Sequence, residues 1–223
     1  MVRWKNMIII WHGQSFFEIR SRERGGGEIK ITIDPFDRTS GLKMPKVEGD
    51  ILIISHSHQD VSNKKAITGT PFVIEEPGEY ELKRIFIRGI PAFHDNSGGK
   101  ERGTITIYKI EAEDINICHL SDLGQKELDE QQLEEIGEID ILMIPVGGSS
   151  TIGPKEAAAI ISQIEPKMVI PMHYKIPKLK LSLEPIGKFL KIMGAEGVEP
   201  RKKLKISLKD LPKEETEIVV LTP

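Results

Sequence analysis

The sequence predicts a single-domain α/β protein, residues 1–223, whose first half is rich in strands and whose second half alternates strands with helices. Short runs of branched apolar residues, bounded by turn residues, make up most of residues 7–120. From residue 126 onward, amphipathic helical patterns separate buried strands. Two facing sheets with helices on their outer sides fit this order, and a doubly wound sheet fits it too.

The strands of the first half are separated by turn residues. His12-Gly13-Gln14 breaks the first pair, Pro35 ends the third strand, and residues 38–50 form a loop. A short helical turn is expected at 64–67. The expected strands are 7–11, 15–19, 28–33, 51–54, 70–74, 80–87, 89–93, 104–110 and 115–120.

The second half contains three expected helices. The first, 126–136, is acidic and turns Leu128 and Leu133 inward, and the second begins at Pro154, a position that proline favours. The third covers 183–193. The strands between and after them are expected at 139–145, 168–171, 204–207 and 217–221.

Charge and composition exclude several classes of protein. The 223 residues carry a formal net charge of -3, from 34 acidic and 31 basic side chains, which argues against a nucleic-acid or anionic-lipid partner. Cys118 is the one cysteine, so no internal disulfide forms. The N-terminus lacks a signal pattern, and no segment approaches the ~20 apolar residues of a membrane span. A cytoplasmic protein without membrane association is expected.

Polar residues directly follow the expected buried strand 51–54. Two imidazoles lie one residue apart in the segment Ser55-His56-Ser57-His58-Gln59-Asp60. Both can bind the same ion if the backbone is no longer extended at this point. Asp60 offers an oxygen ligand or a proton acceptor. The alternative is a pair of ordinary loop histidines with an aspartate that caps the next turn.

The other histidines show the same placement. Of the six in the chain, five fall at or just after an expected strand end, and only His119 lies within a strand. If the strands align, these side chains converge on one rim. Three histidines make a tetrahedral site that keeps one place for water, whose pKa falls to near ~7. Further polar residues, Asp60, Asp122 and His173, could hold a second ion or orient the hydroxide.

The order His-x-His-x-Asp, then a lone His, an Asp and a final His resembles the metallo-β-lactamase-fold hydrolase superfamily. More narrowly, it resembles the small branch that includes L-ascorbate-6-phosphate lactonase and many uncharacterised Zn-dependent hydrolases. The resemblance implies a four-layer αβ/βα sandwich of two mixed sheets flanked by helices, with the site at one edge. It rests on Trp11-His12-Gly13-Gln14-Ser15-Phe16, Thr32-Ile33-Asp34-Pro35, Gly78-Glu79-Tyr80-Glu81, Cys118-His119-Leu120-Ser121-Asp122-Leu123-Gly124 and Pro171-Met172-His173-Tyr174.

The same resemblance implies a ligand set. One or two Zn²⁺ ions are expected, with Mn²⁺ or Ni²⁺ as alternatives. The family usually has a histidine directly after the aspartate of the motif, where this chain has Val61, so a weakened or altered second site is expected. By resemblance, His56, His58 and His94 hold the first ion, Asp122 bridges, and Asp60 and His173 hold the second.

These observations predict a metal-dependent hydrolase. A metal-bound hydroxide would attack an ester, lactone or phosphodiester of a small anionic substrate, and Asp60 would take or relay the proton. His12 could hold substrate or hydroxide as a catalytic residue, or be a turn histidine. A nuclease or cyclic-nucleotide phosphodiesterase, and a catalytically silent metal-binding protein, remain alternatives. The sequence does not predict the oligomeric state.

Three further features have two interpretations each. His119 either braces a ligand or is a hydrogen-bonded core histidine. The loop Gly147–Gly153 either receives an anion before a helix or is a plain connection. The lysines after His173, which are Lys175, Lys178 and Lys180, could face an anionic substrate.

Overall fold

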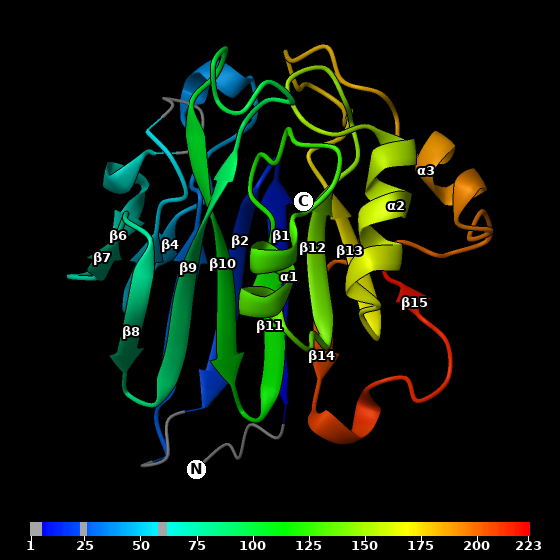
Figure 1. Ribbon diagram of the computed structural model, residues 1–223. Coiled ribbons are helices and arrows are strands. Elements are labelled where there is room, and N and C mark those ends of the chain that lie inside the picture. Colours follow the sequence, from blue (N-terminus) through cyan, green and yellow to red (C-terminus); the bar gives the residue numbers. More distant parts are fainter. Residues whose placement is uncertain (1–5, 23–25, 58–61) are drawn as a thin grey trace.

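The computed structural model describes residues 6–22, 26–57 and 62–223, and these form two large sheets packed face to face (Figure 1). The six-stranded sheet has the order β14-β1-β2-β3-β5-β7, and the seven-stranded sheet has the order β15-β13-β12-β11-β10-β9-β8. The main apolar core lies between them. The predicted sandwich of two mixed sheets is therefore confirmed.

The first sheet begins with two antiparallel hairpin pairs and continues with parallel strands. Along β1 the side chains of Met7, Ile9 and Trp11 enter the main core, as the two-residue period of a strand requires. On β2, Phe17 faces that core, while Phe16 packs on the other face. The strands are β1 (Met7–Gly13), β2 (Phe16–Arg22), β3 (Glu28–Ile33), β5 (Ile51–Ile53), β7 (Phe72–Ile74) and β14 (Leu204–Ile206).

The second sheet is antiparallel from β8 to β11 and parallel from β11 to β15. Every residue of β12 and β13 is buried, as expected for parallel strands covered on both faces. The strands are β8 (Gly78–Leu82), β9 (Ile85–Phe93), β10 (Thr104–Ala112), β11 (Ile115–His119), β12 (Ile141–Pro145), β13 (Met168–Met172) and β15 (Glu217–Ile218).

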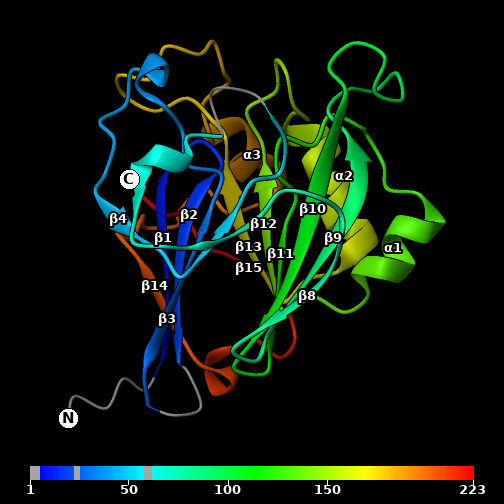
Figure 2. The same ribbon diagram turned by 90° about the vertical axis from the view of Figure 1, so that its left-hand side faces the viewer.

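Helices cover the outer face of the second sheet. Figure 2 shows α1 (Glu130–Ile136) and α2 (Pro154–Ile164) on that side, and α3 (Gly187–Ile192) packs against α2. Asp129 caps α1 by accepting the backbone N–H of Gln132 at 2.8 Å, so this helix starts later than the predicted residue 126. Likewise α3 starts after Pro185 rather than at 183.

The outer face of the first sheet is covered by shorter elements. Phe36, Val47 and Ile67 pack there on Leu52 and Ile54 in a second apolar cluster. The segment that supplies them contains η1 (Arg38–Ser40), η2 (Lys64–Ala66) and the small ribbon of β4 (Val47–Glu48) and β6 (Ile67–Thr68). A further 3-10 turn, η3 (Leu208–Asp210), lies near the C-terminus.

The prediction of a strand over 80–87 was wrong. The chain reverses at Lys83 and Arg84, whose φ angles of 51° and 66° form the turn between β8 and β9. No Gly or Asn marks this turn, so sequence reasoning missed it. The separate strand expected at 89–93 is the second part of β9. Because β8 pairs with β9 only as far as Gly89, Pro91 faces no described strand on that side and needs no backbone N–H there.

Strand directions bring several strand ends to one rim of the sandwich. In the first sheet, β1 and β5 run the same way, because β2 is antiparallel to both β1 and β3 and β5 is parallel to β3. In the second sheet, β9, β11 and β13 also share one direction. Both β1 and β9 point toward the top of Figure 1, so the segments after these strands meet there. Among the described helices, none combines the length and apolar character needed to cross a bilayer.

Candidate metal centre

Three potential ligands meet at this rim, each from the segment after a different strand. His56 follows β5, His94 follows β9 and Asp122 follows β11. All three are buried, and one ligand atom from each lies within 4.8 Å of the others. His56 comes from the first sheet and the other two from the second, so the group lies where the two sheets meet.

A fourth predicted ligand joins the group. His173, which directly follows β13, places Nε2 3.4 Å from Asp122 Oδ2, and His56 Nε2 lies 4.0 Å from the same oxygen. Burial raises the pKa of the Asp122 carboxyl, but the His173 and His56 imidazoles and the Ser15 hydroxyl outweigh this and hold it well below its usual range. Asp122 is therefore a carboxylate that lies between two imidazoles.

This donor set fits a divalent cation. Donors around one tetrahedral ion lie about 3.3 Å apart when each bond is about 2.0 Å long. The distances of 3.4 Å and 4.0 Å around Asp122 Oδ2 are close to that spacing. Imidazole nitrogen with carboxylate oxygen suits zinc and its neighbours in the first transition row. The residues present can therefore hold an ion with small side-chain adjustments.

Hydroxyl groups fix the tautomer of His56. Asp34 accepts the backbone N–H of Ser55 at 2.8 Å and its hydroxyl at 2.7 Å. Ser121 in turn donates its hydroxyl to Ser55 Oγ. Because the one proton of the Ser55 hydroxyl goes to Asp34, His56 Nδ1, 2.9 Å away, must be the donor to Ser55 Oγ. In the neutral ring, Nε2 therefore carries the lone pair and can bind a cation.

A second set of hydrogen bonds orients Asp122. Ser15 donates its hydroxyl to Asp122 Oδ1 at 2.5 Å, and the Ser15 carbonyl accepts His119 Nε2–H at 3.0 Å. His119 Nδ1 accepts the backbone N–H of Ser121 at 3.1 Å. Burial lowers the pKa of His119 to about 4, so the ring is neutral near pH 7. His119 thus holds Ser15, which in turn bonds to the predicted ligand Asp122, as the first of its two interpretations requires.

Two glycines allow the ligand-bearing segments to come together. A Cβ added at Gly124 would overlap the His94 carbonyl and lie 2.5 Å from the Asp95 nitrogen. A Cβ at Gly147 would overlap the His173 carbonyl and lie 2.9 Å from Tyr174 Cα. Both positions therefore need glycine for close backbone approach.

The loop after His94 is organised by the Asp95 carboxylate. It accepts four backbone N–H groups at 2.8–3.0 Å, from Ser97, Gly99, Glu101 and Arg102. Burial raises the pKa of Asp95, but these four donors outweigh it and lower the pKa overall. This charge-assisted cap fixes the chain immediately after His94.

His12 has a different set of neighbours. It lies within β1, its Nε2 is 3.2 Å from Glu18 Oε2, and its ring centroid is 4.7 Å from that of Phe16. Glu18 also accepts Arg20 Nε–H at 2.6 Å. Phe16 belongs to the outer apolar cluster, so these contacts place His12 on the outer face of the first sheet. A catalytic role for His12 stays a prediction.

Several predicted residues do not enter the described site. His58 and Asp60 lie outside the described residues, as does Val61. The ammonium group of Lys175 donates hydrogen bonds to the carbonyls of Leu179 and Leu181 at 2.6 Å and 2.9 Å. Lys175 therefore stabilises the loop in which it lies. The loop before α2 has an acidic residue, Glu156, in the first helical turn, which disfavours a bound anion and so favours the plain connection of its two interpretations.

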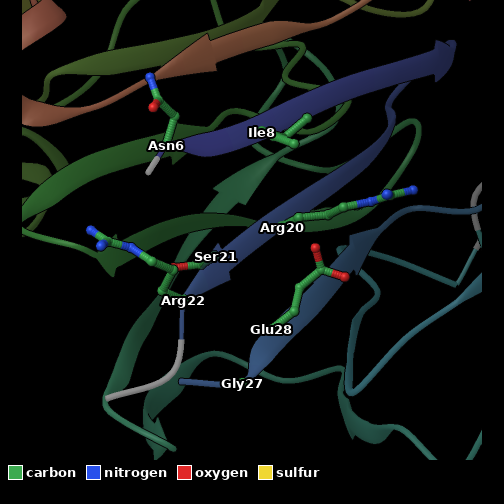
Figure 3. Close-up of a pocket in the computed structure, with 7 residues that line it drawn as sticks. All are labelled: Asn6, Ile8, Arg20, Ser21, Arg22, Gly27 and Glu28. Atoms are coloured by element: carbon green, nitrogen blue, oxygen red, sulfur yellow. The ribbon is translucent and has the colours of Figure 1, made fainter. Parts of the chain in front are cut away.

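Two pockets lie away from this group. Figure 3 shows a small one, of about 10 Å³, where Asn6 precedes β1 and Gly27 precedes β3. It has room for about one water molecule. A larger pocket of about 290 Å³ borders β8, β9 and β10 and includes Phe86 and Arg88. None of the predicted ligands at the rim lines either of these pockets.

Comparison with known proteins agrees with this geometry. Residues 8–173 match the model of the β-lactamase superfamily domain, a segment that runs from β1 to His173. The chain belongs to this superfamily. A UPF0173 metal-dependent hydrolase of Thermococcus onnurineus is 30% identical over 192 residues, or 73% of this chain and 82% of that protein. A relative of the same name from Methanopyrus kandleri is 29% identical over 75% of this chain and 84% of its own length.

Solved structures of similar proteins show the same fold. A Thermotoga maritima protein, whose name suggests a Zn-dependent hydrolase of the metallo-β-lactamase superfamily, is 36% identical with a TM-score of 0.78. The match covers 97% of this chain and all of that one. A metallo hydrolase of Ignicoccus hospitalis, 18% identical with a TM-score of 0.65, shares the fold over 92% of this chain and all of its own. The protein is thus a metal-dependent hydrolase of the metallo-β-lactamase superfamily.

Sequence reasoning missed the residues that support the ligands. Ser55 and Ser121 were quoted in the motifs without a role, and so were Ser15 and Gly124. Each is a neighbour, within two residues, of a strand end or a predicted ligand. That proximity is the one signal that could have identified them, because their partners come from distant segments.

Proposed function

We propose that the protein hydrolyses an ester, lactone or phosphodiester bond of a small anionic substrate, with Zn²⁺ as its ion. The observation that carries this proposal is the buried group of His56, His94 and Asp122, assembled from three strand ends. In the proposal, His58 completes the first ion site, and Asp122 is shared with a weaker second site that includes Asp60 and His173.

The chain's own residues prepare the site before substrate arrives. A divalent ion held there would lower the pKa of its water to near ~7 and polarise the oxygen under attack. Ser55 keeps the His56 Nε2 lone pair exposed to the ion, and Ser15 keeps the Asp122 carboxylate in place. Because these groups are already oriented, little reorganisation is needed during the reaction. We assign the transfer of the proton to Asp60.

Charge near the rim supports an anionic substrate. The loops 36–46 and 174–186 are joined by a hydrogen bond from Lys180 N to Ser40 O at 2.9 Å. Leu42 and Ile176, one from each loop, both border Gly13 at the end of β1. Each loop carries three basic side chains and one acidic one, although the whole chain has a net charge of -3. A locally positive rim attracts anions to the site.

The test combines metal content with a substrate screen. Generic esters, lactones and bis-p-nitrophenyl phosphate are offered to the protein with Zn²⁺, Mn²⁺ or Ni²⁺, and bound metal is measured by elemental analysis. We expect hydrolysis of at least one class, and fewer than two tightly bound zinc ions per chain because Val61 replaces a ligand. His56→Ala should lose both metal and activity.

Two results would count against parts of this proposal. A metal-loaded protein that hydrolyses none of these compounds would favour the catalytically silent metal-binding alternative. His12→Ala is measured in parallel, and full activity in that variant would remove His12 from the predicted catalytic residues.

A further inference from the structure

Gln14 is a buried residue whose side chain the fold leaves unsatisfied. Its relative exposure is 0%, and neither Oε1 nor Nε2 has a hydrogen-bond partner among the described residues. Buried amides are normally paired, because desolvating a donor or acceptor without replacing its hydrogen bonds is costly. An amide with both ends unpaired therefore needs a specific explanation.

Other buried glutamines of the same protein are fully engaged. Gln125 accepts the Phe93 N–H at 3.0 Å and donates to Gln132 Oε1 at 2.6 Å. Gln132 also donates to the Pro91 carbonyl at 2.9 Å. The side-chain amides of these two buried glutamines are hydrogen-bonded within the part of the protein that the structure describes, whereas the amide of Gln14 is not.

The backbone of Gln14 is fixed beside the metal centre. Its carbonyl accepts Trp11 Nε1–H at 2.7 Å and the backbone N–H of His173 at 3.2 Å. The next residue, Ser15, donates to Asp122. Gln14 adopts a φ of 51°, a conformation that non-glycine residues rarely adopt. The turn between β1 and β2 is thus held on both sides by predicted ligands, while the side-chain amide of Gln14 stays unpaired among the residues described.

We propose that Gln14 is a substrate-binding residue, whose Nε2–H donates to an oxygen of the scissile ester, lactone or phosphodiester group. Oε1 then accepts a proton from a hydroxyl of the substrate or from a water bound with it. The inference rests on the proposed hydrolase function and adds a specificity contact to it. The amide stays unpaired until substrate completes its hydrogen bonds, so the interaction is gained only on binding.

The experiment replaces the amide with an apolar side chain of similar shape. Gln14→Met removes both unpaired atoms, and Gln132→Met is the matched control at a buried glutamine that is fully bonded. We measure thermal unfolding of the metal-free proteins, zinc content, and kcat and KM on whichever generic substrate the wild type hydrolyses. Gln14→Met should keep its zinc and raise Tm by about 2–4 °C. It should lose about 10²–10³-fold in kcat/KM, the effect of removing one donor to the reacting oxygen.

Gln132→Met should behave in the opposite way, with a lower Tm and an unchanged kcat/KM. If Gln14→Met also lowers Tm and keeps kcat/KM, the amide is structural and the inference is overturned. If the wild type hydrolyses nothing, the proposed function fails, whereas a lowered Tm in Gln14→Met rejects the inference alone. A raised Tm with an unchanged kcat/KM would also overturn the inference, because the amide would then be unpaired without contacting the substrate.

Discussion

Two serine hydroxyl groups orient side chains of the candidate metal centre through hydrogen bonds. Ser15 and Ser55 each contact a predicted ligand directly, at 2.5 Å from Asp122 Oδ1 and 2.9 Å from His56 Nδ1. Neither is itself a ligand. Each restricts the orientation of a side chain that would otherwise rotate, so the ion meets donors that are already positioned.

Removing the Ser15 hydroxyl should weaken metal binding without unfolding the protein. In Ser15→Ala, Asp122 loses the bond to Oδ1, and we expect zinc affinity to fall by about 10–100-fold. Competition with a chromogenic chelator measures the affinity. Ser162→Ala is the matched control, because Ser162 is exposed on α2 and its hydroxyl, among the described residues, bonds only to the Ala158 carbonyl. Equal zinc affinity in the two variants would show that Ser15 does not position Asp122.

At the level of elements, the site depends on how closely loops approach strand ends. The segment after β11 reaches β9 through Gly124, whose N–H donates to the Phe93 carbonyl at 3.0 Å. This contact brings Asp122 and His94 together. It succeeds because glycine has no side chain at the point where the two backbones meet.

Gly124→Ala should therefore damage both stability and the metal centre. The added methyl must displace the His94 backbone, and we expect a loss of about 1–3 kcal/mol in the free energy of unfolding. Urea denaturation measures this loss, and zinc affinity should fall with it. Gly187→Ala makes the same chemical change at the start of α3, where nothing lies within 4 Å, and should be neutral or slightly stabilising. A Gly124→Ala protein as stable as Gly187→Ala would contradict this account.

At the level of the whole molecule, the stability of the fold should depend on pH through His119. Burial lowers its pKa to about 4 from an ordinary value near 6.5. Between those two values the unfolded chain takes up a proton that the folded chain does not. Stability therefore falls as pH decreases from about 6.5 to about 4, by about 3 kcal/mol in total, and is unaffected by His119 above that window.

His119→Gln tests this dependence, because glutamine can still donate to the Ser15 carbonyl but does not titrate. Urea denaturation of the metal-free wild type and variant is followed from pH 7 to pH 4. The variant should show a shallower decline, whatever its stability at pH 7, because the other histidines titrate in both proteins. Parallel curves would mean that His119 is not buried as a neutral ring.

Local patterns in the sequence predicted an α/β protein and most strands but left a doubly wound sheet open, and the family resemblance selected the two-sheet sandwich. The sequence also predicted that His56, His94, Asp122 and His173 lie together. The strands and this grouping follow from local patterns, since burial imposes periodicity on strands and the rigid strand ends carry polar residues. The turn at Lys83 and Arg84 was missed because neither residue is a usual turn former.

Tertiary structure decided what depends on distant partners. The pairing of β1 with β14 joins residues about 200 positions apart, and no local pattern specifies it. The contact of His12 with Glu18, the support of Asp122 by Ser15, and the unpaired amide of Gln14 likewise depend on strand register. A one-residue change of register between β1 and β2 would turn His12 or Glu18 to the other face of the sheet and would displace the turn that holds Gln14 and Ser15, so only the folded chain determines these contacts.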